Sequence, residues 1–297
     1  MGLPTRGDII RTYDAIAESF DRARERPWPE VAEFAATFPR STIVLDLGCG
    51  NGRHAKALCD AGHRVVGLDA SRGLLPIARR REPRAALVQG DVCGLPFRDR
   101  TFSSAIAVAT IHHLPSDAER LLAIREMYRV LTIGGRALVS AWAFEQARFE
   151  KDLDVRAASD AREATDVWIP WRGGGATVDR FYHLFRDGEL RDLILRSGLR
   201  LERYFRSGDN DFVVAERDGC YVNFAHRLQY APWAVRPPAG AWVEGQLYWR
   251  LLGMPGLFNA RQVLTEVATE ISYFEAAAGE IPATGIDLRV NQLASSV

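Results

Sequence analysis

A strongly apolar strand that runs into a glycine-rich turn constrains the fold of this chain most. Residues 43–47 read Ile-Val-Leu-Asp-Leu, and residues 48–52 read Gly-Cys-Gly-Asn-Gly. A continuous apolar run that ends in a turn is typical of a strand buried on both faces. The glycines allow the backbone to approach a ligand closely, and a helix after them would present free N–H groups. The segment predicts a ligand-binding loop at the first strand of an α/β sheet.

Strands and helices alternate along the chain after this turn. The expected strands cover residues 43–47, 64–69, 86–91, 102–109, 136–143, 199–206 and 211–216. The expected helices cover residues 8–24, 31–38, 53–61 and 118–131, with a further helix that Ser71 caps and that ends at Arg80. The order predicts an α/β fold with a doubly wound, mostly parallel, seven-stranded sheet and an antiparallel terminal hairpin.

The chain of 297 residues is somewhat long for one average domain. Residues 1–218 are expected to form the catalytic domain, with a loop-rich insertion at 145–185. Because this insertion follows the fifth strand, it would lie where doubly wound sheets bind ligands, and we expect it to act as a substrate lid. Residues 219–297 hold three tryptophans and form an aromatic-rich C-terminal extension of unknown role, too aromatic for a disordered linker.

Composition limits the classes of partner. Lys plus Arg and Asp plus Glu both number 38, so no global field attracts nucleic acid or an anionic membrane. An RNA partner would therefore need a local patch. The four cysteines stand at positions 49, 59, 93 and 220 without Cys-x-x-Cys spacing, which predicts no metal site and suits the cytoplasm. No apolar stretch approaches eighteen residues, so a membrane span is not expected.

Acidic residues at the strand ends favour S-adenosylmethionine over a dinucleotide as the ligand of the loop. Asp46 would repel a pyrophosphate but suits a sulfonium and an ammonium group. Asp69 ends the second strand, where an acid can accept hydrogen bonds from both ribose hydroxyls, and Asp91 follows the third strand and can bind the adenine amino group. The expected cofactor-binding residues are Asp46, Gly48, Cys49, Gly50, Asn51, Gly52, Asp69, Ala70, Asp91, Val92 and Ala109.

Five further segments carry a resemblance to a known family. They are Arg26-Pro27-Trp28-Pro29, Ala109-Thr110-Ile111-His112-His113, Trp142-Ala143-Phe144-Glu145-Gln146, Val167-Trp168-Ile169-Pro170-Trp171 and Arg180-Phe181-Tyr182-His183. From Tyr13 to about Asp218 the chain resembles the tRNA wobble-uridine methyltransferases that esterify 5-carboxymethyluridine. It departs from them at Ile133, where the family more often has proline, and in the extension after Asp218, which has no counterpart in the family pattern.

The resemblance implies an acceptor carboxylate in the anticodon loop of tRNA. Because an ordinary carboxyl group has a pKa of roughly 4, this acceptor is ionised at neutral pH and needs no general base. The residues expected to act on it are Arg26, His112, His113, Trp142, Arg180, Tyr182 and His183. The basic side chains would orient one oxygen, Trp142 and Trp28 would stack on the uracil, and Tyr182 and His183 would close the site. The resemblance also implies a small zinc-binding activator subunit at the sheet edge near the third strand.

Several alternatives stay open on the sequence alone. The two histidines could cap a strand end, Trp28 could belong to the core, and Glu145-Gln146 could cap the next segment. The arginines at 79–81 and 84 could follow tRNA phosphates or form a solvated helix end. The enzyme could instead be a small-molecule C- or O-methyltransferase, or the chain a cofactor-binding scaffold. The extension could pack on this domain or form a homo-oligomer.

Overall fold

The computed structural model describes residues 4–146, 156–157, 165–173 and 177–218. Its main sheet has seven strands in the order β3-β2-β1-β4-β5-β10-β9. These strands are β1 (Ile43–Leu47), β2 (Arg64–Asp69), β3 (Ala86–Gln89), β4 (Phe102–Val108), β5 (Leu131–Trp142), β9 (Arg200–Ser207) and β10 (Asn210–Glu216). β1 to β5 pair in parallel, whereas β10 runs antiparallel to both of its neighbours. The predicted fold class is confirmed.

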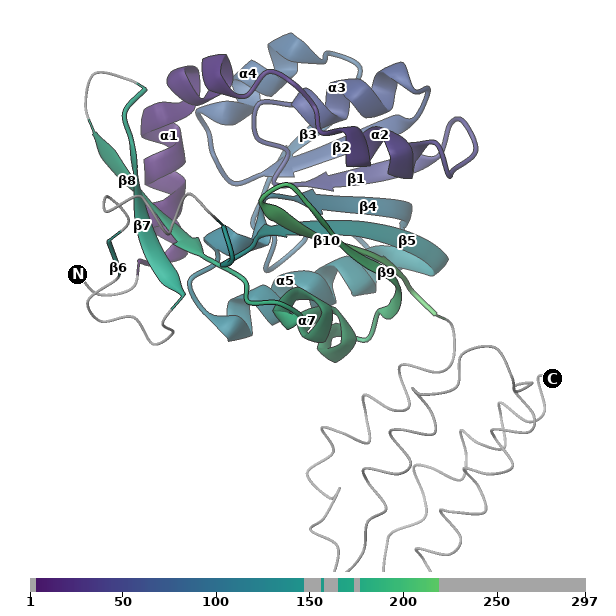
Figure 1. Cartoon of the computed structure of the whole chain (residues 1–297). Coiled ribbons are helices and arrows are strands. Elements are labelled where there is room, and N and C mark those ends of the chain that lie inside the picture. Colours follow the sequence, from purple (N-terminus) through teal and green to yellow (C-terminus); the bar gives the residue numbers. More distant parts are fainter. Residues whose placement is uncertain (1–3, 147–155, 158–164, 174–176, 219–297) are drawn as a thin grey trace, which may run out of the picture. The chain divides into compact units, whose positions relative to one another are not determined.

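Helices cover both faces of the sheet (Figure 1). They are α1 (Arg6–Ala23), α2 (Pro29–Ala35), α3 (Arg53–Asp60), α4 (Leu74–Arg81), α5 (Asp117–Val130) and α7 (Glu189–Ser197), with a short 3-10 helix η1 (Ile111–His113). α2, α3 and α4 lie on one face, and α5 and α7 lie on the other. Within the described residues, no helix is long and apolar enough to cross a membrane.

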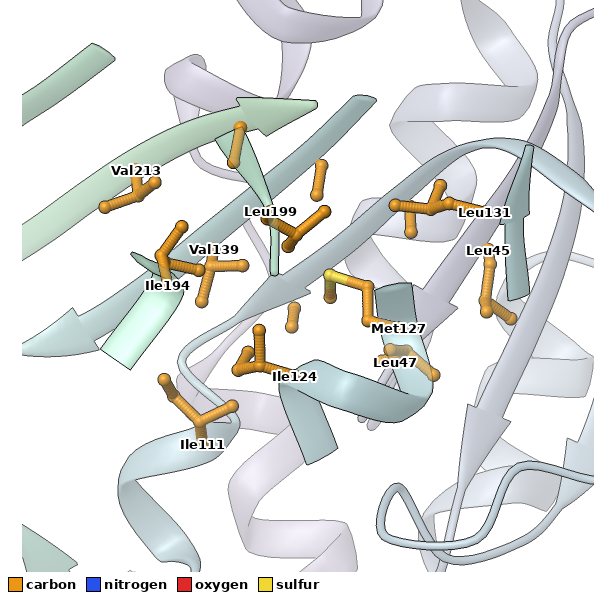
Figure 2. Close-up of a cluster of buried hydrophobic side chains, with 14 of the residues drawn as sticks. Leu45, Leu47, Ile111, Ile124, Met127, Leu131, Val139, Ile194, Leu199 and Val213 are labelled. Atoms are coloured by element: carbon orange, nitrogen blue, oxygen red, sulfur yellow. The ribbon is translucent and has the colours of Figure 1, made fainter. Parts of the chain in front are cut away.

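The larger part of the core fills the space between the sheet and helices α5 and α7 (Figure 2). Leu45 and Val139 from the sheet pack there with Ile124 and Met127 from α5 and Ile194 from α7, and each of these side chains is fully buried. A buried aliphatic side chain of this size contributes roughly 1.5–3 kcal/mol. This core fixes the carboxyl ends of β1, β4 and β5, on which the site is built.

Several predicted boundaries differ from the structure, and three of them differ for reasons that the hydrogen bonds show. α1 begins at Arg6 because a capping box precedes it: Thr5 Oγ1 accepts the Asp8 N–H, and the Thr5 N–H donates to Asp8 Oδ2 at 2.8 Å. α4 begins at Leu74, although Ser71 Oγ still accepts the Leu74 N–H as predicted. β5 begins at Leu131, because the expected turn at 134–135 pairs with Arg217, directly after β10.

The expectation that residues 145–185 are loop-rich was wrong for their described part. β6 (Arg156–Ala157), β7 (Asp166–Trp171) and β8 (Val178–His183) form a second, antiparallel sheet. Proline is uncommon inside a sheet, but β6 pairs with β7 only at Val167 and Trp168, away from Pro170. α7 was not predicted either. The expected C-terminal extension, 219–297, lies outside the described residues.

Candidate active site

The glycine-rich loop lies at the carboxyl end of β1. It needs glycine both for a left-handed backbone conformation and for close packing against its neighbours. Gly48 has a φ of +70°, and a Cβ there would overlap the side chain of Thr110. Gly52 has a φ of +78°, and a Cβ there would lie 3.0 Å from the Cα of Ala78 in α4. The loop therefore packs closely against the residue that precedes η1 on one side and against α4 on the other.

A cavity lies over this loop, and most of the expected cofactor-binding residues line it. Gly48, Gly50, Asp69, Ala70, Asp91, Val92 and Ala109 all line it. α1 covers it from the opposite side with Arg6, Ile9, Ile10, Tyr13 and Phe20. The cavity lies at the carboxyl ends of parallel strands, where doubly wound folds bind their ligands.

Asp69 is held in place by two backbone donors. Its Oδ2 accepts the Gly50 N–H at 2.7 Å and its Oδ1 accepts the Ser71 N–H at 2.8 Å. Burial raises the pKa of Asp69, and these hydrogen bonds oppose the rise. Each carboxylate oxygen retains a further lone pair, so the fixed carboxylate can accept both hydroxyls of a ribose.

Asp46, the β1 residue beside Asp69, does not itself line the cavity, but its buried carboxylate favours a cationic ligand there. The residue is 1 % exposed, and its Oδ2 has no hydrogen-bond partner among the described residues. Burial, with the neighbouring Asp69, raises the pKa of Asp46 to about 7. An unpaired buried carboxylate is costly, and the sulfonium and ammonium groups of S-adenosylmethionine would offset that cost. The residues present therefore fit this cofactor.

Cofactor affinity should depend on pH through Asp46. A cation favours the ionised carboxylate, so affinity should rise as pH increases through the pKa of about 7. Between pH 7.5 and pH 6 we expect a loss of about tenfold, because one pH unit below a pKa leaves about a tenth of the group ionised. Calorimetric titration with S-adenosylhomocysteine measures this slope. Asp46→Asn should bind weakly with a flat profile, and a wild-type slope in that variant would contradict the assignment.

Asp91 lines the cavity but already has partners. Its Oδ1 accepts the Cys93 N–H at 2.8 Å, and its Oδ2 lies 2.9 Å from Arg6 Nη1. Arg6 thus joins the start of α1 to the loop after β3. A ligand amino group can share this half-exposed carboxylate, so the predicted contact to adenine remains a proposal.

Besides Asp46, three predicted cofactor-binding residues do not line the cavity and instead shape the loop. Cys49 is buried under the loop, where its sulfur lies beside Gly67 of β2. Asn51 Nδ2 donates to Asp21 Oδ1 and to the Arg24 carbonyl, both at 2.8 Å. Gly52 makes the close approach to α4 described above. In the structure, their side chains or backbone shape the turn and connect it to α1 and α4.

A second cavity adjoins the first and brings together six of the seven residues expected to act on the acceptor. Arg26, His112, His113, Trp142, Arg180 and Tyr182 line it. The segment after α1, η1, the end of β5, strand β8 and the turn between β9 and β10 form its walls. Residues from distant parts of the chain thus meet in one place.

His112 is a neutral imidazole with a defined tautomer. Its Nδ1 accepts the Trp142 N–H at 3.0 Å, so the ring proton is on Nε2. Burial, with His113 and Arg180 nearby, holds the pKa of His112 well below its usual value. The side chain therefore offers an uncharged N–H donor to the second cavity.

His113 is the reverse tautomer and braces the insertion against α1. Its Nδ1 lies 3.2 Å from the Phe181 carbonyl and donates to it, so Nε2 accepts the Tyr13 hydroxyl at 3.0 Å. Burial lowers the pKa of His113 to about 3. Through these hydrogen bonds the two histidines connect η1 to β5, β8 and α1. They are therefore more than a cap at the end of a strand.

Arg180 is buried without a counter-ion in the described part of the chain. It is 4 % exposed, and its Nη1 donates to the Tyr182 hydroxyl at 2.6 Å. The guanidinium carbon lies 4.6 Å from the Trp171 ring centroid, while Nε has no hydrogen-bond partner among the described residues. An arginine is always charged, so this one is set up to receive an anion.

Aromatic rings line the walls of the same cavity. Tyr182 stacks on Trp142 with centroids 4.4 Å apart and planes inclined by 10°. Trp28 is half-buried against Phe212 and the Arg53 guanidinium, yet it also lines the cavity. Trp28 therefore both packs against the core and lines the second cavity, so the two interpretations of this residue hold together. Arg26 is exposed at the rim.

His183 does not line the cavity, contrary to expectation. Strand residues alternate between faces, so Arg180 and Tyr182 point to the cavity and His183 points away. Its Nδ1 lies 2.7 Å from Asp166 Oδ1, and its Nε2 lies 2.7 Å from Glu189 Oε1. Burial lowers the pKa of His183, but the two carboxylates outweigh it and raise the pKa overall. His183 therefore ties β7, β8 and α7 together as an imidazolium.

This clamp predicts a pH-dependent contribution to stability. Since the folded-state pKa of His183 is raised, its stabilisation is complete below the unfolded value of about 6.5 and is lost as pH rises through the folded value. His183→Gln should lower the free energy of unfolding by about 2 kcal/mol at pH 6. Urea denaturation at pH 6 and pH 9 tests this, and a difference between wild type and variant that grows at pH 9 would refute it.

The remaining polar segments have structural partners. Arg80, Arg81 and Arg84 pair with Glu18, Asp21 and Asp60 respectively, which supports the solvated helix end over a track for phosphates. Gln146 is buried, and its Nε2 donates to the Ala143 and Asp209 carbonyls. Gln146 thus holds the chain after β5 to the turn that forms one wall of the second cavity.

Sequence reasoning missed Tyr13, Arg53 and Asn210, all of which line the second cavity. Tyr13 has the periodicity of an ordinary helix face, so no local signal marked it. Asn210 is the register partner of Trp142, a relation that only the pairing of β10 with β5 reveals.

The sheet order, the glycine-rich loop and the strand-end acids define a class I S-adenosylmethionine-dependent methyltransferase. A methyltransferase-domain family matches residues 45–139. The chain is 30% identical over 230 residues to the tRNA (carboxymethyluridine(34)-5-O)-methyltransferase of Schizosaccharomyces pombe, covering 71% of this chain and 96% of that protein. It belongs to this family of methyltransferases.

Two further similarities mark the extent of the match. The tRNA (carboxymethyluridine(34)-5-O)-methyltransferase alkbh8 of Xenopus tropicalis is 28% identical over 261 residues, and the chain covers only 40% of its length. A chain from the solved complex between the Haloferax volcanii Trm112 methyltransferase activator and a methyltransferase is 16% identical, with a TM-score of 0.52. That match covers 71% of this chain and 98% of the other, and it shows a shared fold.

Proposed function

We propose that this enzyme transfers the methyl group of S-adenosylmethionine to the carboxylate of 5-carboxymethyluridine at the wobble position of tRNA, forming a methyl ester. Residues 1–218 are the methyltransferase domain in this proposal, and the insertion 145–185 is the substrate lid that contributes Arg180 and Tyr182. Family membership supports the reaction, and the second cavity supports the chemistry of the acceptor.

Arg180 is the observation that carries the proposal. A buried guanidinium with no ion pair in the described chain costs several kcal/mol. A ligand carboxylate would offset this cost and receive planar, two-point recognition. Arg26 at the rim adds positive charge, and the neutral His112 donates one hydrogen bond without drawing further charge from the acceptor oxygen.

The aromatic walls fit a nucleobase beside that carboxylate. Single-stranded anticodon bases are commonly read by stacking on aromatic side chains, and the stacked Trp142 and Tyr182 offer such a surface. The small-molecule alternative predicts an apolar acceptor cavity without arginines, and the arginines at this cavity weigh against it. We therefore favour the modified base of tRNA.

Positioning and exclusion of water are the work of the protein in this reaction. When bound, S-adenosylmethionine supplies an electrophilic methyl group. Arg180 and His112 would orient one acceptor oxygen, and the aromatic walls would displace its water. No described side chain needs to remove a proton, because the acceptor is already ionised. Positioning of this kind can contribute on the order of 7–11 kcal/mol.

We propose that a small zinc-binding activator subunit docks on strand β3. β3 lies at one edge of the main sheet, and its Leu87 and Val88 are only partly buried. An unpaired edge is a template for strand addition. We also propose cytoplasmic localisation, which the free, buried thiols of Cys49, Cys59 and Cys93 support. A homo-oligomer through the extension remains a proposal about residues outside the described ones.

Comparison of two tRNAs tests the acceptor. Purified protein, supplied with the candidate activator and labelled S-adenosylmethionine, is incubated with tRNA carrying 5-carboxymethyluridine or with the same tRNA carrying unmodified uridine. We expect label only in the first. Equal labelling of both tRNAs would place the acceptor elsewhere, and labelling of neither, with cofactor binding demonstrated, would favour the small-molecule alternative.

A further inference from the structure

The two cavities share part of their lining, and a methyl group transferred from the cofactor to the acceptor has to pass from one cavity to the other. Four residues line both cavities: Tyr13, Phe20, Ala109 and His113. Ala109 adopts a left-handed backbone conformation with a φ of +56°, uncommon for a residue other than glycine. Phe20 has an apolar side chain, and its ring meets the Tyr13 ring edge to face with the ring centroids 5.6 Å apart. Tyr13 and His113 therefore bring the only polar side chains among these four.

The direction of each hydrogen bond in this shared lining follows from His113. Its Nδ1–H donates to the Phe181 carbonyl, so Nε2 can only accept, and the Tyr13 hydroxyl must donate to it at 3.0 Å. The Tyr13 oxygen is then left with lone pairs and no proton to offer elsewhere. The Tyr182 hydroxyl accepts from Arg180 at 2.6 Å and is the donor in its long 3.5 Å contact with the Tyr13 oxygen, which leaves that oxygen one further lone pair.

A fixed acceptor oxygen therefore stands at the boundary between the cofactor cavity and the acceptor cavity. Since the Tyr13 O–H is committed to His113, the oxygen cannot donate to an incoming carboxylate and would not hold it back. Methyl hydrogens on a sulfonium are polarised, and an oxygen can accept a weak C–H···O hydrogen bond from them.

We propose that Tyr13 is a catalytic residue whose phenol oxygen contacts the transferring methyl group and keeps it directed at the acceptor oxygen. The identity of the acceptor rests on the proposed function, whereas the contact with the methyl group does not. In the transfer, an acceptor carboxylate oxygen forms a bond to the methyl carbon while the carbon–sulfur bond breaks. The electron pair of that bond stays on sulfur, and Tyr13 neither gains nor loses a proton.

Binding of two cofactor forms tests the contact without any acceptor. Tyr13→Phe keeps the ring and removes only the oxygen, and Tyr128→Phe is the matched control, because Tyr128 lines neither cavity and its hydroxyl has no hydrogen-bond partner among the described residues. Calorimetric titration of the full chain gives affinities for S-adenosylmethionine and S-adenosylhomocysteine, which lacks the methyl group. We expect Tyr13→Phe to lose about two- to fivefold in its preference for S-adenosylmethionine, and Tyr128→Phe to keep the wild-type preference.

A spectroscopic measurement gives a second readout on the same variants. With ¹³C-methyl-labelled S-adenosylmethionine, the bound methyl proton resonance should shift downfield in wild type and move back in Tyr13→Phe. An unchanged cofactor preference, or equal loss of affinity for both forms, would overturn the proposal. Failure of the tRNA experiment with a changed preference would instead reject only the proposed acceptor and leave the role of Tyr13 standing.

Discussion

Replacing Arg180 with methionine should lower kcat/KM for tRNA by about a hundred- to a thousandfold and leave cofactor affinity unchanged. Loss of one member of a buried charge pair typically costs 2–5 kcal/mol, and a tenfold change corresponds to about 1.4 kcal/mol. Arg180 lines the acceptor cavity and not the cofactor cavity, so the two effects should separate.

Stability should respond in the opposite direction to activity. In the free enzyme Arg180 is a buried cation with no ion pair in the described chain. Methionine fills a similar volume and removes the cost of burying that charge. We expect the free energy of unfolding of Arg180→Met to stay level or to rise by about 1 kcal/mol, since the lost contacts with Trp171 and Tyr182 offset part of the gain.

Steady-state kinetics and urea denaturation measure the two quantities on the same preparations. Arg98→Met is the control, because Arg98 is exposed and lines neither cavity. An Arg180→Met enzyme with wild-type kcat/KM would remove the proposed carboxylate holder. A variant that loses activity only because it unfolds would show a lowered unfolding free energy, contrary to the expectation.

Replacing Asp69 with alanine should weaken cofactor binding by about a hundredfold or more. The change removes acceptors for two ribose hydroxyls, each hydrogen bond to a charged group contributing about 1.5–3 kcal/mol. It also releases the Gly50 N–H, which fixes the glycine-rich loop. Both losses act on the same cavity, so the effect should appear in the dissociation constant for S-adenosylhomocysteine.

Asp69→Asn is a milder substitution at the same position and should weaken cofactor binding less. An amide keeps one acceptor oxygen and the shape of the side chain, so we expect a loss of about tenfold. Asp99→Ala removes an exposed carboxylate that does not line the cofactor cavity and should bind as wild type does. Equal affinities for Asp69→Ala and wild type would show that the ribose is held elsewhere.

The fold could be predicted because its signals are local. Apolar runs such as residues 43–47 and 102–109 and the glycine turn after the first strand are each complete within a few residues. Once the strands are recognised, the acidic residues at their ends are recognised too. Asp69 and Asp91 could therefore be assigned from the sequence alone to the cavity that they line. The helix and strand boundaries were less predictable, since a cap or a distant pairing decides some of them, as at Thr5 and Arg217.

The acceptor site depended on contacts that sequence spacing does not reveal. Tyr13 meets His113 across 100 positions and Tyr182 across 169. His183 was misplaced because the strand β8 was not recognised. Had it been, alternation would have put Arg180 and Tyr182 on one face and His183 on the other. Family resemblance found most of these residues, but their tautomers and pairings required the structure.

Alkali treatment of the labelled product tests the central claim most directly. After transfer from labelled S-adenosylmethionine to tRNA carrying 5-carboxymethyluridine, with the candidate activator present, mild alkali hydrolyses a methyl ester but spares methyl groups on carbon or nitrogen. We predict that the label is released from the tRNA and that Arg180→Met incorporates almost none. Label that stays on the tRNA after alkali would contradict esterification of a carboxylate.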